Sequence, residues 1–110
     1  MRLLIAGDHP SSISLAATFA DDWVAPVATF TQGLSLLRER ERTTGRTQPP
    51  VRTHLLHELR ASEPLAESPF GRDPQGVCAA AHAAGADGVI VTVRTERDAE
   101  EALQLLAKLR

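Results

Sequence analysis

Features that often point to function are scarce in this chain of 110 residues. It has one cysteine, Cys78, which excludes an internal disulfide and fits a reducing cytosol. Its formal net charge of −2 gives no strong field to attract nucleic acid or an anionic membrane surface. No apolar run approaches the length of a transmembrane helix, and Asp8 and His9 interrupt the first run too early for a signal peptide. We therefore expect a cytoplasmic protein that binds neither membrane nor nucleic acid.

The motifs of several enzyme classes are also missing. Residues 7–12, GDHPSS, lack the lysine and the glycine spacing of a phosphate-binding loop, and the chain has neither Gly-x-Ser-x-Gly nor Cys-x-x-Cys. Cys78 and His82 have a spacing that suits two metal ligands on one helix, but no third ligand is evident nearby. We expect no metal and no cofactor, and the sequence leaves open whether the protein is an enzyme.

Strand and helix patterns alternate along the chain. The continuous apolar run at residues 3–6 is typical of a strand covered on both faces. The other strand candidates are residues 24–30, 51–59 and 88–93, and Pro26 places the second at a sheet edge or delays its start. Helix candidates follow each strand at 13–22, from Thr31 to near Gly45, from Asp73-Pro74 to near Gly85, and at 96–110. The expected helix caps are Ser11 or Ser12, Thr31, Asp73 and Thr95.

Four βα units in series predict parallel strands with right-handed crossovers. The sequence therefore predicts a single three-layer α/β domain over residues 1–110, with a four-stranded, mainly parallel sheet of the flavodoxin class. Residues 60–75 form the longest irregular stretch, and their prolines and glycine make an extended helix there unfavourable. A long loop inside a compact domain is often functional.

Ligands of parallel sheets bind beyond the carboxyl ends of the strands. Four predicted loops share that edge, at residues 7–9, 31–32, 57–60 and 92–95. From three of them we select seven candidate binding or switch residues: Asp8, His9, His57, Glu58, Arg60, Thr92 and Arg94.

The two candidates closest to the N-terminus have a structural alternative beside the functional one. Asp8 is suited to bind a metal or to transfer a proton, and equally to satisfy backbone donors in a turn. His9 is suited to act as a general base near neutral pH, and equally to shape the turn before Pro10. His54 and His57 lie three apart on a predicted strand, so they face opposite sides and do not chelate one metal together.

Three segments resemble the receiver domains of bacterial response regulators. Residues 2–10, RLLIAGDHP, are similar to the opening strand of that family, with Gly7 in place of its first acid and Asp8 matching its second. Residues 54–62, HLLHELRAS, resemble its third strand, where His57 and Glu58 stand at the phospho-accepting aspartate. Residues 80–93, AAHAAGADGVIVTV, resemble its closing helix and strand, with Thr92-Val93 in place of lysine-proline. The resemblance implies a degenerate receiver that cannot be phosphorylated by the usual magnesium-dependent route, with Glu58 mimicking a permanently charged state.

A second resemblance involves the C-terminal half. Residues 57–64, HELRASEP, followed by residues 72–93, are similar to a βαβ segment of indole-glycerol-phosphate synthase and related barrels. This resemblance implies that Arg60 and Ser62 meet a substrate. Because the chain is far too short for a full eight-unit barrel, it also implies a half-barrel that dimerises.

Two functional hypotheses follow. The first is a non-enzymatic regulatory module that docks the last two helices, with the strand between them, onto itself or a partner protein; close approach of alanine-rich helices favours a homodimer. The second is a small enzyme or binding protein for a phosphorylated or carboxylated metabolite, in which Arg60 and Arg94 hold the anion and Asp8 or His9 moves protons. Convergence of Asp8, Glu58, Arg60 and Arg94 on one pocket favours the second hypothesis, and separate side chains in solvent favour the first. The excess of arginine over lysine, with abundant alanine, indicates a GC-rich bacterial genome.

Overall fold

The computed structural model describes residues 1–60 and 62–109, in which four strands alternate with helices. The strands are β1 (Leu4–Ala6), β2 (Asp22–Pro26), β3 (Arg52–His57) and β4 (Gly88–Val91). The helices are α1 (Pro10–Phe19), α2 (Val27–Thr43), the 3₁₀ turn η1 (Leu65–Glu67), α3 (Pro69–Arg72), α4 (Pro74–Ala83) and α5 (Glu96–Lys108). Every neighbouring pair of strands is parallel. The α/β class, the four-stranded parallel sheet and the βα repeats predicted from the sequence are confirmed.

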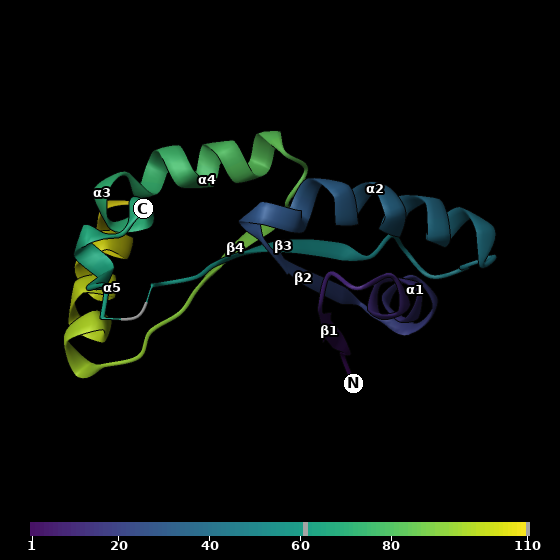
Figure 1. Cartoon of the computed structure of the whole chain (residues 1–110), viewed down its shortest axis with the longest axis horizontal. Coiled ribbons are helices and arrows are strands. Elements are labelled where there is room, and N and C mark those ends of the chain that lie inside the picture. The colour runs from purple at the N-terminus through teal and green to yellow at the C-terminus, as the bar shows by residue number, and fades with distance from the viewer. Residues whose placement is uncertain (61, 110) are drawn as a thin grey trace.

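The strands lie side by side in their chain order, β1-β2-β3-β4 (Figure 1). β1 and β4 are therefore the two edges of the sheet among the described residues, and β2 is an inner strand. The prediction that Pro26 puts the second strand at an edge or delays its start is wrong, because β2 is an inner strand and begins at Asp22. Pro26 is the last residue of β2 and pairs with Leu56 of β3, while β1 ends opposite Val24. The missing N–H of Pro26 thus removes no hydrogen bond from the β1 side of the sheet.

Several predicted boundaries are wrong by a few residues, each for a local reason. α1 begins at Pro10, which suits the first helical position, and its cap is His9 rather than Ser11 or Ser12. β2 begins at Asp22 and ends at Pro26. α2 then begins at Val27, before Thr31, the residue predicted to cap this helix. α2 has no side-chain cap. The caps predicted at Asp73 and Thr95 are confirmed, since their side chains accept hydrogen bonds from the backbone N–H groups of Gly76 and Asp98.

The hydrophobic core lies on one face of the sheet. Strand side chains alternate between faces, and Trp23 and Ala25 of β2 share their face with Leu55 of β3. The helices α1, α2 and α4 all contribute to the same cluster, with Ile13, Ala16, Ala17, Phe30, Leu37 and Ala81. Consecutive βα units with one crossover hand place their helices on one side of the sheet.

The opposite face of the sheet carries a different set of side chains. The pairing register puts Leu4, Ala6, Asp22, Val24, Arg52, His54, Leu56 and Ile90 there. Val24 is buried but does not belong to the hydrophobic cluster that the helices share. No described helix lies over this face in Figure 1.

The last part of the chain forms a separate group at the end of the sheet where β3 and β4 finish. There α5 packs on η1, which in turn packs on α3 (Figure 1). Asp98 joins these elements, because its carboxylate accepts hydrogen bonds from the backbone N–H of Leu65 and of Arg94. Residues 62–72 are thus partly helical, and Ala61 lies outside the described residues. Ala99, Leu103 and Leu106, which share one side of α5, are exposed rather than packed.

The molecule is more extended than its length requires. The radius of gyration is 15.0 Å, whereas a compact chain of this length has a radius of about 13 Å. Its accessible surface is 7054 Å², against about 5,900 Å² for a typical folded monomer of the same 11.8 kDa mass. Among the described residues, no helix combines the length and the apolarity needed to cross a membrane.

Candidate functional site

A cavity of about 710 Å³ opens at the carboxyl edge of the sheet. It lies over the end of β3, between the first turns of α2 and the helix α4, and Glu58, Arg60, Glu63, Glu67 and Pro69 also line it. Its floor is apolar and includes Phe30, Leu55, Leu56, Val77 and Ala81. The volume falls within the range of about 300–1,000 Å³ that small-molecule sites occupy.

The polar rim of the cavity combines predicted and unpredicted residues. Of the seven candidates, His57, Glu58 and Arg60 line the cavity, while Asp8, His9, Thr92 and Arg94 do not. Sequence reasoning missed three charged side chains that also line it, Glu63, Glu67 and Arg72. The unusual length of the irregular stretch at residues 60–75 was the signal that pointed there, but it singled out no individual residue.

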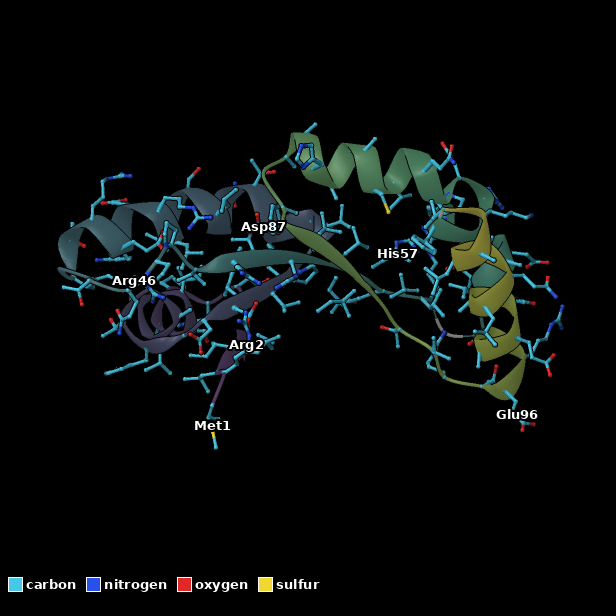
Figure 2. All side chains as sticks on the ribbon, turned by 180° about the vertical axis from the view of Figure 1, so that it is seen from behind. Met1, Arg2, Arg46, His57, Asp87 and Glu96 are labelled. Carbon is cyan, nitrogen blue, oxygen red and sulfur yellow. The ribbon has the colours of Figure 1, made fainter. Side chains whose placement is uncertain are left out.

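His57 is the buried polar group of the cavity wall. Its ring lies against Phe70, with ring centroids 5.8 Å apart, and the backbone N–H of Phe70 donates to its Nε2 at 3.4 Å. Because Nε2 accepts, the proton of the neutral ring is on Nδ1. Burial lowers the pKa of His57 from its usual 6.5, and the nearby Glu63 carboxylate acts in the opposite direction. Figure 2 shows His57 at the end of β3, on the side of α3 and α5.

The buried neutral His57 makes stability depend on pH. Its folded-state pKa lies below its unfolded value of 6.5, so between these two values the unfolded chain binds more protons than the native one. The free energy of unfolding is therefore expected to fall as pH drops below about 6.5. Urea denaturation at a series of pH values from about 8 to 5.5 measures this slope.

His57→Gln is the matched control for that prediction, because it keeps an acceptor atom but does not titrate. Its stability curve should be flatter than that of the wild-type protein over the same pH window. Asp22, whose pKa is also lowered, contributes only near and below its usual value of 3.8, outside this window. Equal slopes for the two proteins would show that His57 is not buried in its neutral form.

Asp8 and His9 hold the first βα turn together. The Asp8 carboxylate accepts a hydrogen bond from the Thr29 hydroxyl at 2.8 Å, which links this turn to the start of α2. His9 Nδ1 accepts from the Ser11 backbone N–H at 3.3 Å and caps α1. Gly7, which precedes them, has a φ of +144°, a backbone conformation that residues other than glycine rarely adopt. The backbone at position 7 therefore requires glycine.

Arg94 and Thr92 follow β4 and lie away from the cavity. The Arg94 guanidinium donates to the backbone carbonyl of Arg60 at 2.6 Å, so it ties the two loops together. Thr92 is half-buried, with no hydrogen bond to another described side chain. The pKa of Asp98 is lowered, mainly by the hydrogen bond from the Leu65 backbone N–H, with further donors at Arg94 and Thr95. Arg60 and Arg94 therefore do not converge as a clamp for one anion.

A charged cluster occupies the other face of the sheet, at the amino ends of the strands. Asp22 accepts hydrogen bonds from Arg2 Nη2 at 2.9 Å and pairs with His54 Nε2 at 2.9 Å. The hydrogen bond with His54 is the largest cause that lowers the Asp22 pKa, and Arg2 acts the same way while burial opposes both. His54 and His57 point to opposite faces, as their spacing predicted.

The cavity brings together only part of the predicted site. Two of the four residues whose convergence favours a ligand site, Glu58 and Arg60, line the cavity, while Asp8 and Arg94 have partners elsewhere. Within residues 1–60 and 62–109, no three histidine, cysteine or carboxylate side chains gather as a metal site. Cys78 is a free, half-buried thiol. No protein-family model matches this chain, and neither a curated protein nor a solved structure resembles it significantly.

Proposed function

We propose that this protein is a non-catalytic interaction module of a regulatory kind, which acts by associating with protein rather than by transforming a substrate. The observation that carries the proposal is the excess surface. The folded chain exposes about 1,100 Å² more than a monomer of its mass normally does. A standard protein–protein interface removes about 800 Å² from each partner. The excess is therefore of the size that one stable interface covers.

The composition of the exposed surface supports the same proposal. Large apolar side chains that are more than two-fifths exposed occur on β1, α1, α2 and the α5 region. Leu103 of α5 is 71% exposed and Leu4 of β1 is 50% exposed. Large apolar surface left exposed on a soluble protein marks association sites. A location in the bacterial cytoplasm accompanies this proposal and is favoured by the single, reduced cysteine.

Sedimentation velocity of the purified chain tests the proposal. We expect the sedimenting mass to rise above 11.8 kDa as the protein concentration increases. A chain that remains monomeric throughout the series, and that purifies without a stoichiometric partner, would contradict an interaction module.

The receiver resemblance leads to a prediction about phosphorylation. Incubation with acetyl phosphate and Mg²⁺ is expected to add no phosphoryl group. Of three residues at the predicted acidic site, Gly7 stands in place of one acid, Glu58 lines the cavity, and Asp8 accepts a hydrogen bond from Thr29. The carboxylates needed to hold one Mg²⁺ are therefore not assembled. Intact-mass spectrometry measures the outcome, and a stoichiometric phosphoryl adduct would contradict a degenerate receiver that the usual magnesium-dependent route cannot phosphorylate.

A further inference from the structure

We propose that the cavity at the end of β3 binds a free α-amino acid with a large apolar side chain. The proposal does not depend on the interaction function proposed above, because a module that associates with protein can also bind a small molecule. It rests on three parts of the cavity wall. These are an apolar floor, hydrogen-bond donors suited to a carboxylate, and one acid suited to an ammonium group.

The floor of the cavity suits a large apolar side chain. Phe30 and Leu55 form part of it and belong to the hydrophobic core. The helix α4 contributes Val77, Ala80 and Ala84. Alanine side chains are too short to fill the space, which holds about 710 Å³. Small-molecule sites are typically lined in this way, by apolar side chains with a few polar groups that orient the ligand.

The first turn of α2 supplies donors for a carboxylate. This helix begins at Val27 and has no side-chain cap. The first N–H groups of a helix have no partner within the helix, and they form the positive end of its dipole, so they bind anions. Val27 and Ala28 both line the cavity. We therefore place the carboxylate of the ligand at this turn.

His57 supplies a second donor. It is 5% exposed, and its Nε2 accepts from the Phe70 N–H, so the neutral ring carries its proton on Nδ1. In the described part of the chain Nδ1 has no hydrogen-bond partner, and no fully buried side-chain nitrogen or oxygen there lacks one. Nδ1 therefore remains accessible, and the cavity that His57 lines gives that access. A carboxylate in the cavity would accept from this N–H.

Glu63 supplies the acid for an ammonium group. The other charged side chains that line the cavity are exposed, whereas Glu63 is half-buried. Its carboxylate opposes the lowering of the His57 pKa, so the acid and the imidazole ring are neighbours. One oxygen accepts from the backbone N–H of Arg60 at 3.4 Å. A carboxylate can accept several hydrogen bonds, so Glu63 has capacity left for a ligand.

The charges taken together favour a ligand with both signs. The four exposed side chains at the rim cancel, since two are positive and two negative: Arg60, Arg72, Glu58 and Glu67. A simple anion at α2 would meet the Glu63 carboxylate, and a simple cation would meet the donors of α2 and His57. An α-amino acid carries its ammonium and carboxylate groups on one carbon, which matches the closeness of Glu63 to His57.

Titration calorimetry with three matched probes tests the proposal. L-phenylalanine carries both charges, N-acetyl-L-phenylalanine lacks the ammonium group, and L-phenylalaninamide lacks the carboxylate. We expect L-phenylalanine to bind and the other two to bind at least about tenfold more weakly, because each loses a charge-assisted hydrogen bond. The two derivatives also represent the C-terminal and N-terminal residues of a peptide. Equal or tighter binding of either one would overturn the assignment to a free amino acid.

Ala28→Pro removes a backbone N–H proposed to bind the carboxylate. Proline is tolerated in the first turn of a helix, and the matched control Ala28→Gly keeps the N–H. We expect L-phenylalanine to bind the proline variant about tenfold more weakly than the control, which should bind like the wild-type protein. L-phenylalaninamide, which has no carboxylate, should bind both variants equally.

Glu63→Gln tests the ammonium contact, and it decides the question even where Ala28→Pro does not fold. We expect it to weaken the binding of L-phenylalanine about tenfold and to leave that of N-acetyl-L-phenylalanine unchanged. L-phenylalanine that fails to bind the wild-type chain at millimolar concentration, or that binds both variants as tightly as the wild type, would overturn the proposal. Sedimentation without ligand tests the interaction module separately, so either proposal can fail alone.

Discussion

Replacing Trp23 with alanine is expected to lower the free energy of unfolding by about 3–5 kcal/mol. Trp23, the second residue of β2, is fully buried and is the largest side chain of the core. Its ring stacks on Phe30 with centroids 5.6 Å apart, and its Nε1 donates to the Gly7 carbonyl at 2.8 Å. Alanine removes the ring contacts and leaves both a cavity and an unpaired carbonyl, which close-packed surroundings cannot fully repair.

Urea denaturation measures this loss, with Val27→Ala as the control for an equally apolar but exposed side chain. The control is expected to change stability by no more than about 0.5 kcal/mol. The Trp23 variant should also loosen the turn at Gly7 and therefore the position of Asp8 and His9. A loss below about 1 kcal/mol for Trp23→Ala would contradict the packing of α1 and α2 on β2.

Gly33→Ala is expected to lower the free energy of unfolding by about 1–3 kcal/mol, because the added methyl group overpacks the core. A Cβ at this position would stand 2.8 Å from Cζ2 and Cη2 of Trp23. Real Cβ atoms essentially never approach that closely, and the ring cannot retreat because it is held by Phe30 and Gly7. In a helix interior alanine is otherwise favoured over glycine by about 1 kcal/mol, so a net loss means that the clash outweighs the helix propensity.

The same substitution in a Trp23→Phe background provides the discriminating measurement. Phenylalanine lacks the outer ring atoms that face Gly33, so Gly33→Ala should cost less there, or even stabilise. The two substitutions are therefore expected to be non-additive, as neighbours that share one space are. Additive effects, or a stabilising Gly33→Ala in the wild-type chain, would contradict the contact between α2 and the indole ring.

The candidate site was only partly accessible to sequence reasoning. The parallel edge was predicted, and His57, Glu58 and Arg60 do lie together at the cavity. Arg94 was expected to join them because it follows the neighbouring strand, but its guanidinium reaches the carbonyl of Arg60 instead. Which of several loop side chains turns inward depends on the path of residues 62–72. That path is fixed by the contacts of η1 with α5 and with α3, and of α3 with α4.

The burial of Asp98 could not be predicted from the sequence either. The spacing of Thr95 and Asp98 indicated a helix cap, and the Thr95 side chain does accept from the Asp98 N–H at 3.0 Å. The carboxylate of Asp98, however, accepts from Leu65 and Arg94, so it serves a contact between segments that are far apart in the chain. The spacing of Thr95 and Asp98 indicates the capping hydrogen bond between these two residues. It does not indicate the contacts of the Asp98 carboxylate with Leu65 and Arg94.

The sequence by itself determined the βα alternation, the parallel direction of the strands and the caps at Asp73 and Thr95, because apolar periodicity and capping chemistry act over a few neighbouring residues. Only the tertiary structure decided the side-by-side order of the strands, the single helix-covered face and the exposure of apolar side chains on α1 and α5. These depend on which elements pack against which, and similar βα units can be joined in more than one order with nearly the same local patterns.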